Sequence, residues 1–173
     1  QLALVSHQRL FKQYQQHVKT TYPHLNIKIL NDGVTEAGQR LGPLGDLVFA
    51  LDELNWWQQP VLVLPSDRTP ENIIPNLVKT YLKHPDSFVT CLAEDKKENI
   101  KNKSGCALID NNLQIIDFLK KYQQTGKNMD SPGNIIPWLL ENNFPVYSCL
   151  TQHESFDIGD LNELAKFQQE HSA

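Results

Sequence analysis

The chain has 173 residues, with 16 Lys and Arg against 20 Asp and Glu and a formal net charge of −4. A chain of this length forms one domain with its own core, and its acidic balance without a basic face argues against nucleic-acid binding. Its longest apolar runs, of about six residues, are far too short to span a membrane. Cys91, Cys106 and Cys149 are dispersed without a ligand spacing, which predicts reduced core thiols in a cytoplasmic protein.

The first half of the chain alternates strand and helix patterns. Strands are expected over Leu2–Ser6 and Ile27–Leu30, with an amphipathic helix between them. Asn31-Asp32-Gly33 is a turn signal in which the glycine can adopt a positive φ. A polar, glycine-punctuated stretch then leads into an amphipathic helix over Leu44–Leu54, and Pro60–Leu64 has the continuous apolar character of a strand covered on both faces.

The second half repeats this alternation and adds a hairpin. Its expected elements are a helix with Pro75 at its first position that buries Leu77, Val78, Tyr81 and Leu82, a strand over Ser87–Leu92, a helix after the break Asp130–Asn134, a strand over Val146–Leu150 and a closing helix capped by Asp160. Cys106–Asp110 and Leu113–Leu119 flank Asn111-Asn112, a pair typical of a two-residue hairpin turn. The pattern predicts one α/β domain over 1–173, with a mostly parallel sheet covered by helices and one antiparallel hairpin.

Two carboxylates follow strand-like segments ninety residues apart. Asp67 ends the run that begins at Val61, and Asp157 lies in the turn Phe156–Asp160. Open α/β sheets bind ligands beyond the carboxyl ends of their strands, and two carboxylates brought together there would suit Mg²⁺ and phosphates. Taken singly, each aspartate fits an ordinary turn residue equally well.

A glycine-rich segment, Arg40–Asp46, directly precedes the expected helix at Leu44. Glycines at that place allow a ligand to approach the backbone, and a helix N-terminus offers free N–H groups and the positive end of a dipole. An ordinary strand-to-helix turn has the same composition, so this segment alone does not decide between the two.

Taken together and in order, these segments resemble the sugar-phosphate nucleotidyltransferases, most closely the glucose-1-phosphate thymidylyltransferase-like branch. Asn31-Asp32-Gly33 is similar to that family's N-D-G-T, Arg40–Asp46 to its R-L-G-x-x-G-D, and the strand ending at Asp67 to its hydrophobic-G-D-N. Further along the chain, Ser104–Ala107 with Ile115–Phe118 resembles the family hairpin, Asp130–Leu139 its D-x-P-G-N-x-x-x-W-L, and Val146-Tyr147 with Phe156–Gly159 its V-Y…W-F-D-I-G-T.

The resemblance implies a Rossmann-like nucleotidyltransferase three-layer sandwich and a Mg²⁺-dependent reaction in which a sugar 1-phosphate and a nucleoside triphosphate give an NDP-sugar and pyrophosphate. Carried over onto this sequence, Asp67 and Asp157 are the metal carboxylates, and Asp67 acts in catalysis together with Lys121, which stands at the lysine of the family's E-K-P. Gly42, Gly45 and Asp46 border the nucleotide.

Two family segments have no counterpart in the 173 residues: the G-x-G-T-R-L segment expected before Leu2, and the sugar-pocket strand expected after Lys121. The family's G-D-N also stands here as Ser66-Asp67-Arg68. The domain is therefore expected to be incomplete relative to the family. Two functions follow: an enzyme of nucleotide-sugar synthesis, or a catalytically inactive protein of the same fold with a binding or regulatory role. An unrelated dinucleotide-binding module would require a G-x-G-x-x-G after its first strand. The sequence does not specify the base or the sugar, and it leaves homo-oligomerisation open.

Overall fold

The structure is a computed structural model of the whole chain. It describes residues 1–64, 73–85, 87–93, 107–109, 114–130 and 132–151, together with the helical positions 162, 165, 168 and 169. Asp67, Asp157 and the predicted cap Asp160 lie outside these described residues.

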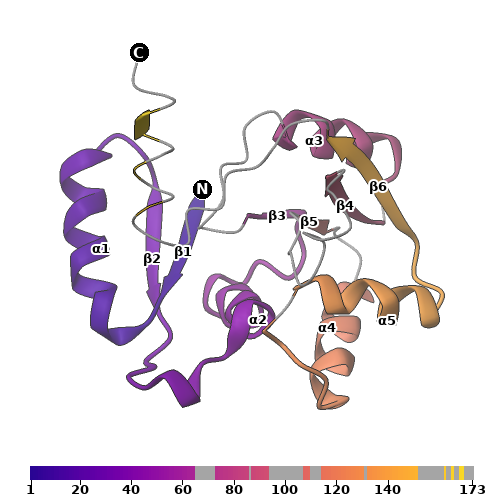
Figure 1. Cartoon of the computed structure of the whole chain (residues 1–173), viewed down its shortest axis with the longest axis horizontal. Helices are drawn as coiled ribbons and strands as arrows, with labels where there is room; N and C mark the ends of the chain where they lie inside the picture. The colour runs from indigo at the N-terminus through magenta and orange to yellow at the C-terminus, as the bar shows by residue number, and fades with distance from the viewer. Residues whose placement is uncertain are drawn as a thin grey trace.

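The first unit of the fold is a strand, a helix and a parallel strand, as the sequence predicts. β1 (Leu2–Ser6) pairs with β2 (Ile27–Asn31), with Leu2 opposite Ile27, and α1 (Gln8–Thr21) connects them. α1 is strongly amphipathic, yet it contains no fully buried residue. This unit stands at one end of the molecule in Figure 1.

The central helix α2 (Gly42–Leu54) begins two residues before the predicted start at Leu44 and follows a short 3₁₀ turn, η1 (Ala37–Gln39). A proline in its first turn suits the helix start, where a backbone N–H has no partner within the helix. The helix ends at Asn55, which has a left-handed φ of 52°. Its buried face is made of Leu44, Leu47 and Leu51.

A second sheet has the strand order β3-β5-β4-β6. Its strands are β3 (Val61–Val63), β4 (Phe88–Ala93), β5 (Ala107–Ile109) and β6 (Val146–Thr151). β4 and β6 are parallel, while β5 runs antiparallel to both β3 and β4. The described strands therefore form two small sheets in place of the single, mostly parallel sheet that the sequence predicts.

The predicted hairpin around Asn111-Asn112 is wrong. Residues 114–124 form a helix, α4 (Gln114–Gln124), where a second hairpin strand over Leu113–Leu119 was expected. The cause is visible in the spacing of Ile115, Leu119 and Tyr122, which recur at helical intervals and would alternate faces in a strand. Leu119 and Tyr122 are fully buried. Among the described strands, only β5 runs antiparallel to its neighbours, between β3 and β4.

The helix predicted from Pro75 is α3 (Ile73–Lys83), which starts two residues earlier. Ile73 and Leu77 are buried, whereas Val78 and Leu82 are exposed. The prediction for those two was wrong because α3 covers the sheet with only one narrow face, and the apolar stripe in its sequence is wider than that face.

The main core lies where α2, α4 and α5 (Ile135–Glu141) meet the second sheet, and α5 follows a 3₁₀ turn, η2 (Pro132–Asn134). Its buried members are Leu44, Leu47, Leu51, Phe88, Leu119, Tyr122, Ile135, Trp138 and Leu139. Trp56 and Trp57 pack against this core after the end of α2. Cys149 is a buried free thiol, which agrees with the prediction of a core cysteine.

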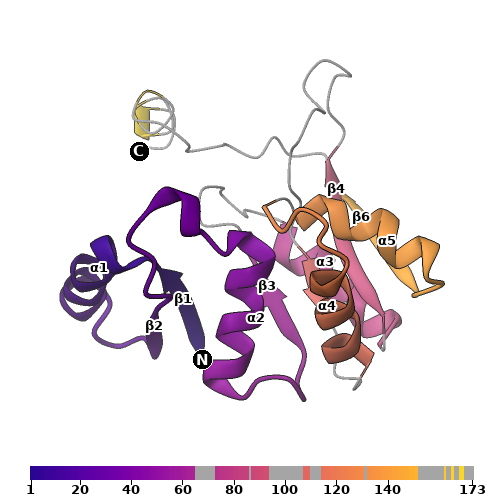
Figure 2. The same ribbon diagram turned by 90° about the horizontal axis from the view of Figure 1, so that it is seen from below.

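The fold is thus mixed α/β, with α2 lying between β1 and β3 in Figure 2. The same helix contacts β1, and Val61 and Val63 of β3 pack against the core to which its buried face contributes. Among the described residues, no helix has the length and apolar character that a membrane span requires.

Candidate functional site

Two of the segments singled out in the sequence meet at the start of α2, although they lie almost ninety residues apart. The backbone N–H of Leu44 donates to the carbonyl oxygen of Met129 at 3.3 Å. Gly42 is buried with a φ of +73°, and a Cβ built on it would lie 2.7 Å from Oδ1 of Asp130 and 2.8 Å from the Met129 carbonyl oxygen. Gly42 therefore allows direct contact between the start of α2 and the Met129-Asp130 segment.

The segment 128–130 is held in place by α4. The Tyr122 hydroxyl donates to the carbonyl oxygen of Asn128 at 3.2 Å, and the backbone N–H of Asp130 donates to Oδ1 of Asn128 at 2.7 Å. Tyr122 is fully buried, so its ring provides a rigid support. The fixed support explains why Met129 and Asp130 can stay so close to the α2 backbone.

The Asn31-Asp32-Gly33 turn follows β2 and is built from two side-chain caps. Oδ1 of Asn31 accepts from the N–H of Gly33 at 3.0 Å, and Oδ1 of Asp32 accepts from the N–H of Val34 at 2.8 Å. Gly33 has the positive φ, +75°, that the sequence predicts for it. The turn fixes the Asp32 carboxylate beside the end of β1, because the N–H of Asp32 donates to the carbonyl oxygen of Ser6 at 3.1 Å.

Asp46, in the first turns of α2, is the most perturbed carboxylate of the described residues. Its Oδ1 is buried, and no described residue forms a hydrogen bond with it. Burial raises the pKa of Asp46 above its usual value, and the negative charge of Asp32 raises it further. The turn after β2 and the start of α2 are therefore electrostatically coupled at the carboxyl end of β1.

The structure adds less about the other residues that the sequence predicts for the site. Gly45 is buried, and a Cβ on it would lie 2.8 Å from Cβ of Leu41. Lys121 lies exposed in the last turn of α4, which continues unbroken past it. Asp67 and Asp157 lie outside the described residues, so their meeting stays a prediction. The structure thus joins Gly42 and Asp46 into one region and leaves the metal pair untested.

Sequence reasoning missed the role of Met129 and Asp130 as neighbours of Gly42. The signal was present, because a buried glycine at a helix start indicates close approach by another backbone segment. What the sequence could not tell is which segment approaches.

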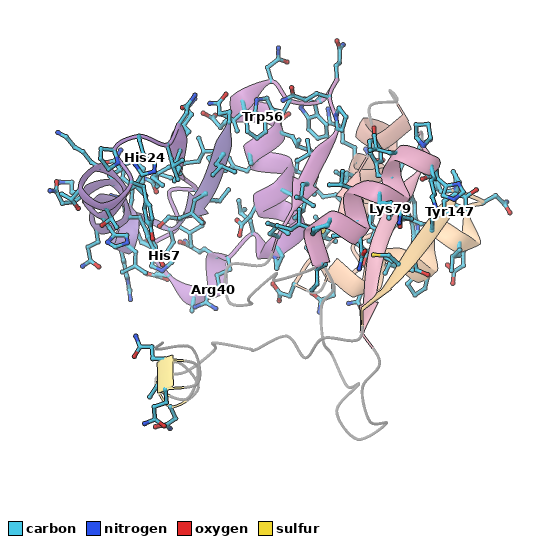
Figure 3. All side chains as sticks on the ribbon, turned by 90° about the horizontal axis from the view of Figure 1, so that it is seen from above. His7, His24, Arg40, Trp56, Lys79 and Tyr147 are labelled. Atoms are coloured by element: carbon cyan, nitrogen blue, oxygen red, sulfur yellow. The ribbon has the colours of Figure 1, made fainter. Side chains whose placement is uncertain are left out.

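In Figure 3, His7 and His24 lie at the end of the molecule formed by β1, β2 and α1, while Lys79 and Tyr147 lie at the opposite end, and Arg40 marks the loop that leads into α2. Within the described part of the chain, no group of three His, Cys, Asp or Glu residues is close enough to hold a metal ion.

No protein-family model matches this chain, and no curated protein sequence matches it. Among solved structures, the chain is similar to one from Bacillus anthracis that is assigned as a glucose-1-phosphate thymidylyltransferase and was crystallised in complex with a sucrose. The TM-score is 0.68, the sequence identity is 11%, and the match covers 97% of this chain and 74% of that chain. This chain has the nucleotidyltransferase fold. At such low identity the likeness establishes the fold alone.

Proposed function

We propose that this chain is a nucleotidyltransferase-like domain of nucleotide-sugar synthesis, and that it binds a nucleoside triphosphate beside the N-terminus of α2. The observation that carries the proposal is the contact between Gly42 and the Met129-Asp130 segment. It joins two segments that resemble separate motifs of one family. The likeness to a glucose-1-phosphate thymidylyltransferase structure over 97% of the chain supports a sugar 1-phosphate as the second substrate.

Asp46 is the proposed hydrogen-bond acceptor for the nucleotide. A half-buried carboxylate with a raised pKa and one buried, unsatisfied oxygen is unfavourable for folding, and such groups concentrate at functional sites. Nucleotides carry hydroxyl and amino donors that a carboxylate can accept from. A ligand donor would offset part of the cost of burying Asp46.

The proposed metal is Mg²⁺, held by Asp67 and Asp157. Carboxylates are the hard oxygen ligands that this ion prefers, and both proposed ligands come from the family resemblance. When bound, Mg²⁺ neutralises charge on the triphosphate. Lys121, exposed at the end of α4, is the proposed cation for the substrate phosphates.

A non-catalytic role is the second candidate, and one observation favours it. The backbone N–H of Leu44, near the start of α2, already donates to Met129. A donor that is already paired does not stabilise the triphosphate, and losing an oriented donor typically costs ~10²–10³-fold in rate. A chain of this kind would bind nucleotide without efficient turnover.

The test is release of pyrophosphate from dTTP or UTP with glucose 1-phosphate and Mg²⁺, run on residues 1–173 beside the Asp67→Asn variant. For the first candidate we expect release that Asp67→Asn abolishes. Nucleotide binding without release would instead favour the non-catalytic role.

A further inference from the structure

β6 is the outer strand of the second sheet, and among the described residues one of its edges is open. Within that part of the chain it pairs only with β4, at the end of the strand order β3-β5-β4-β6. Figure 1 shows β6 at the rim of the molecule, beside α3. Tyr147 and Ser148 are exposed, although both belong to this six-residue strand. An edge strand of this kind presents unpaired backbone groups to which another strand can add.

The pairing of β6 with β4 shows which backbone groups face the open side. The N–H of Phe88 donates to the carbonyl oxygen of Pro145 at 3.0 Å, and Phe88 stands opposite Val146. In a parallel pair, a residue bonds to the two neighbours of the residue opposite it, so the odd-numbered residues of β6 face β4. The N–H and C=O groups of Val146 and Ser148 therefore point away from β4, toward the open side.

The helix α3 lies over β6. The ring of His84, which directly follows α3, stacks on the ring of Tyr147 with centroids 3.8 Å apart and planes at 9° to each other. Further up the helix, Leu77 belongs to the same buried cluster as Cys149 of β6. A helix with its side chains is about 10–12 Å across and neighbouring strands lie about 4.8 Å apart, so a helix over the outermost strand extends past its edge.

The flank of α3 that extends past this edge is apolar. Leu77 and Tyr81 pack on the sheet. Val78 and Leu82 each come one residue later, about 100° further round the helix. β3 and β4 are parallel, and connections between parallel strands are right-handed, so this flank is turned toward the outer side of β6. Val78 is 37% exposed and Leu82 is 71% exposed. The part of the apolar stripe that the sheet leaves uncovered therefore lies beside the open edge.

The distribution of charge at this edge suits a second copy of the chain. Val146–Thr151 contains neither a charge nor a proline, whereas edge strands are normally protected by one or the other. Lys79 and Lys83 of α3 come one residue after the apolar pair, so the helix turns them away from the edge. Groups near a two-fold axis meet their own copies, and an uncharged edge avoids the repulsion between like charges that a charged edge would suffer.

The outer strand at the other end of the described fold has the opposite character. β2 carries an exposed lysine, Lys28, as its second residue. A second copy paired on that edge would bring two such cations close together. Of these two outer strands, β6 is therefore the one that favours self-association.

We propose that this chain forms a homodimer in which β6 pairs antiparallel with β6 of a second copy, and in which the apolar flank of α3 completes the interface. Antiparallel pairing about a two-fold axis perpendicular to the sheet keeps both α3 helices on the same face. The two flanks then cover each other and remove Leu82, the most exposed large apolar side chain among the described residues, from water. The backbone groups of Val146 and Ser148 supply the hydrogen bonds that join the two sheets.

The first test is sedimentation velocity of the 173-residue chain, in which we expect a shift from monomer to dimer between about 1 and 300 µM. Amide hydrogen exchange then locates the interface. The Ser148 amide should exchange at least ~5-fold more slowly in the concentrated sample than in the dilute one, because pairing with a second β6 protects it. The amide of Ile29, which points outward from β2, is the control and should exchange at the same rate in both samples.

Two exposed leucines give a matched comparison. Leu82→Lys places two cations against each other at the interface and should raise the dissociation constant of the dimer at least ~10-fold. Leu25 is 44% exposed and lies next to His24, at the end of the molecule opposite Tyr147 in Figure 3, so Leu25→Lys should leave the dissociation constant unchanged. Ser148→Pro removes an N–H that β4 does not use and should weaken the dimer as Leu82→Lys does. Circular dichroism verifies that each variant folds, and if Ser148→Pro does not fold, Leu82→Lys still decides the question.

Three results would overturn the proposal. A chain that stays monomeric at about 300 µM does not form this dimer, and fast exchange at Ser148 in that monomer would leave the edge to a different partner. A dimer that Leu82→Lys weakens no more than Leu25→Lys uses another surface. Slow exchange at Ser148 in both the dilute and the concentrated sample would mean that another segment of the same chain already covers β6.

Discussion

Gly42→Ala tests the contact on which the candidate site depends. Gly42 has a φ of +73°, and a left-handed conformation costs a residue with a Cβ roughly 1–2 kcal/mol. The new Cβ would also lie 2.7 Å from Oδ1 of Asp130 and 2.9 Å from the carbonyl carbon of Met129. The latter is backbone and cannot move aside by a rotamer change, so overpacking adds about 1–3 kcal/mol.

The expected loss is therefore about 3 kcal/mol, equivalent to a fall in Tm of roughly 6–12 °C for a chain of this size. The chain offers two controls that separate the two causes. Gly126 has a φ of +68° and nothing within 4 Å of its Cβ position, so Gly126→Ala should show the strain alone, about 1–2 kcal/mol. Gly38 has neither strain nor neighbours, and Gly38→Ala should stabilise by about 0.4–1 kcal/mol through the unfolded state.

The assay is urea unfolding of the four proteins, followed by circular dichroism. If Gly42→Ala loses no more stability than Gly126→Ala, the close approach of Met129-Asp130 to α2 does not exist in solution, and the argument for the site fails.

Three further outcomes follow from the described contacts. Burial and Asp32 raise the pKa of Asp46, so ionising this carboxyl costs stability as the pH rises above the usual carboxyl range. Asp46→Asn should therefore raise the urea midpoint at pH 7 and lose this advantage near about pH 3. The same difference in urea midpoint at both pH values would contradict the stated cause. Leu119→Ala should lower the free energy of unfolding in urea by about 2–5 kcal/mol because the residue is fully buried. Leu82→Ala, at 71% exposure, should change it by no more than about 0.5 kcal/mol. Similar losses in the two variants would contradict the assigned core. Tyr122→Phe should cost about 1 kcal/mol in the same experiment by removing the bond to Asn128, and a neutral result would mean that this bond does not support the loop.

The periodic part of the fold is predictable from the sequence. β1, α1 and β2 follow from simple apolar spacing, and their observed ends lie close to the expected ones. The strand predicted over Leu113–Leu119 is wrong because Asn111-Asn112 only resembles a hairpin turn, while Leu119 and Tyr122 recur at helical spacing. The burial of both side chains shows that the helical period prevails.

Pairing between strands was less predictable than the strands themselves. β3 and β1 have the apolar composition of interior strands, so one continuous sheet was the natural expectation. The order in space depends on which strand lies next to which, and a three-residue strand such as β3 carries little of that information in its sequence.

For the candidate site, the sequence identified the segments but not their contacts. Gly42 and Asp130 were assigned to separate motifs, and only the fold shows that one lies against the other. The burial of Asp46 beside Asp32 has the same origin, since it depends on how α2 is positioned over the end of β1. Spacing along a chain does not encode such tertiary positions.

The central claim is that residues 1–173 bind a nucleoside triphosphate at the start of α2. Its most direct test is calorimetric titration of dTTP and UTP with Mg²⁺ into the unsubstituted protein, Gly38→Ala and Gly42→Ala, at a temperature where all three are folded. We predict saturable binding by the unsubstituted protein and Gly38→Ala, and affinity at least ~10-fold lower in Gly42→Ala, equivalent to a loss of about 1.4 kcal/mol. Absence of nucleotide binding in the unsubstituted protein, or equal affinity in all three proteins, would contradict the claim.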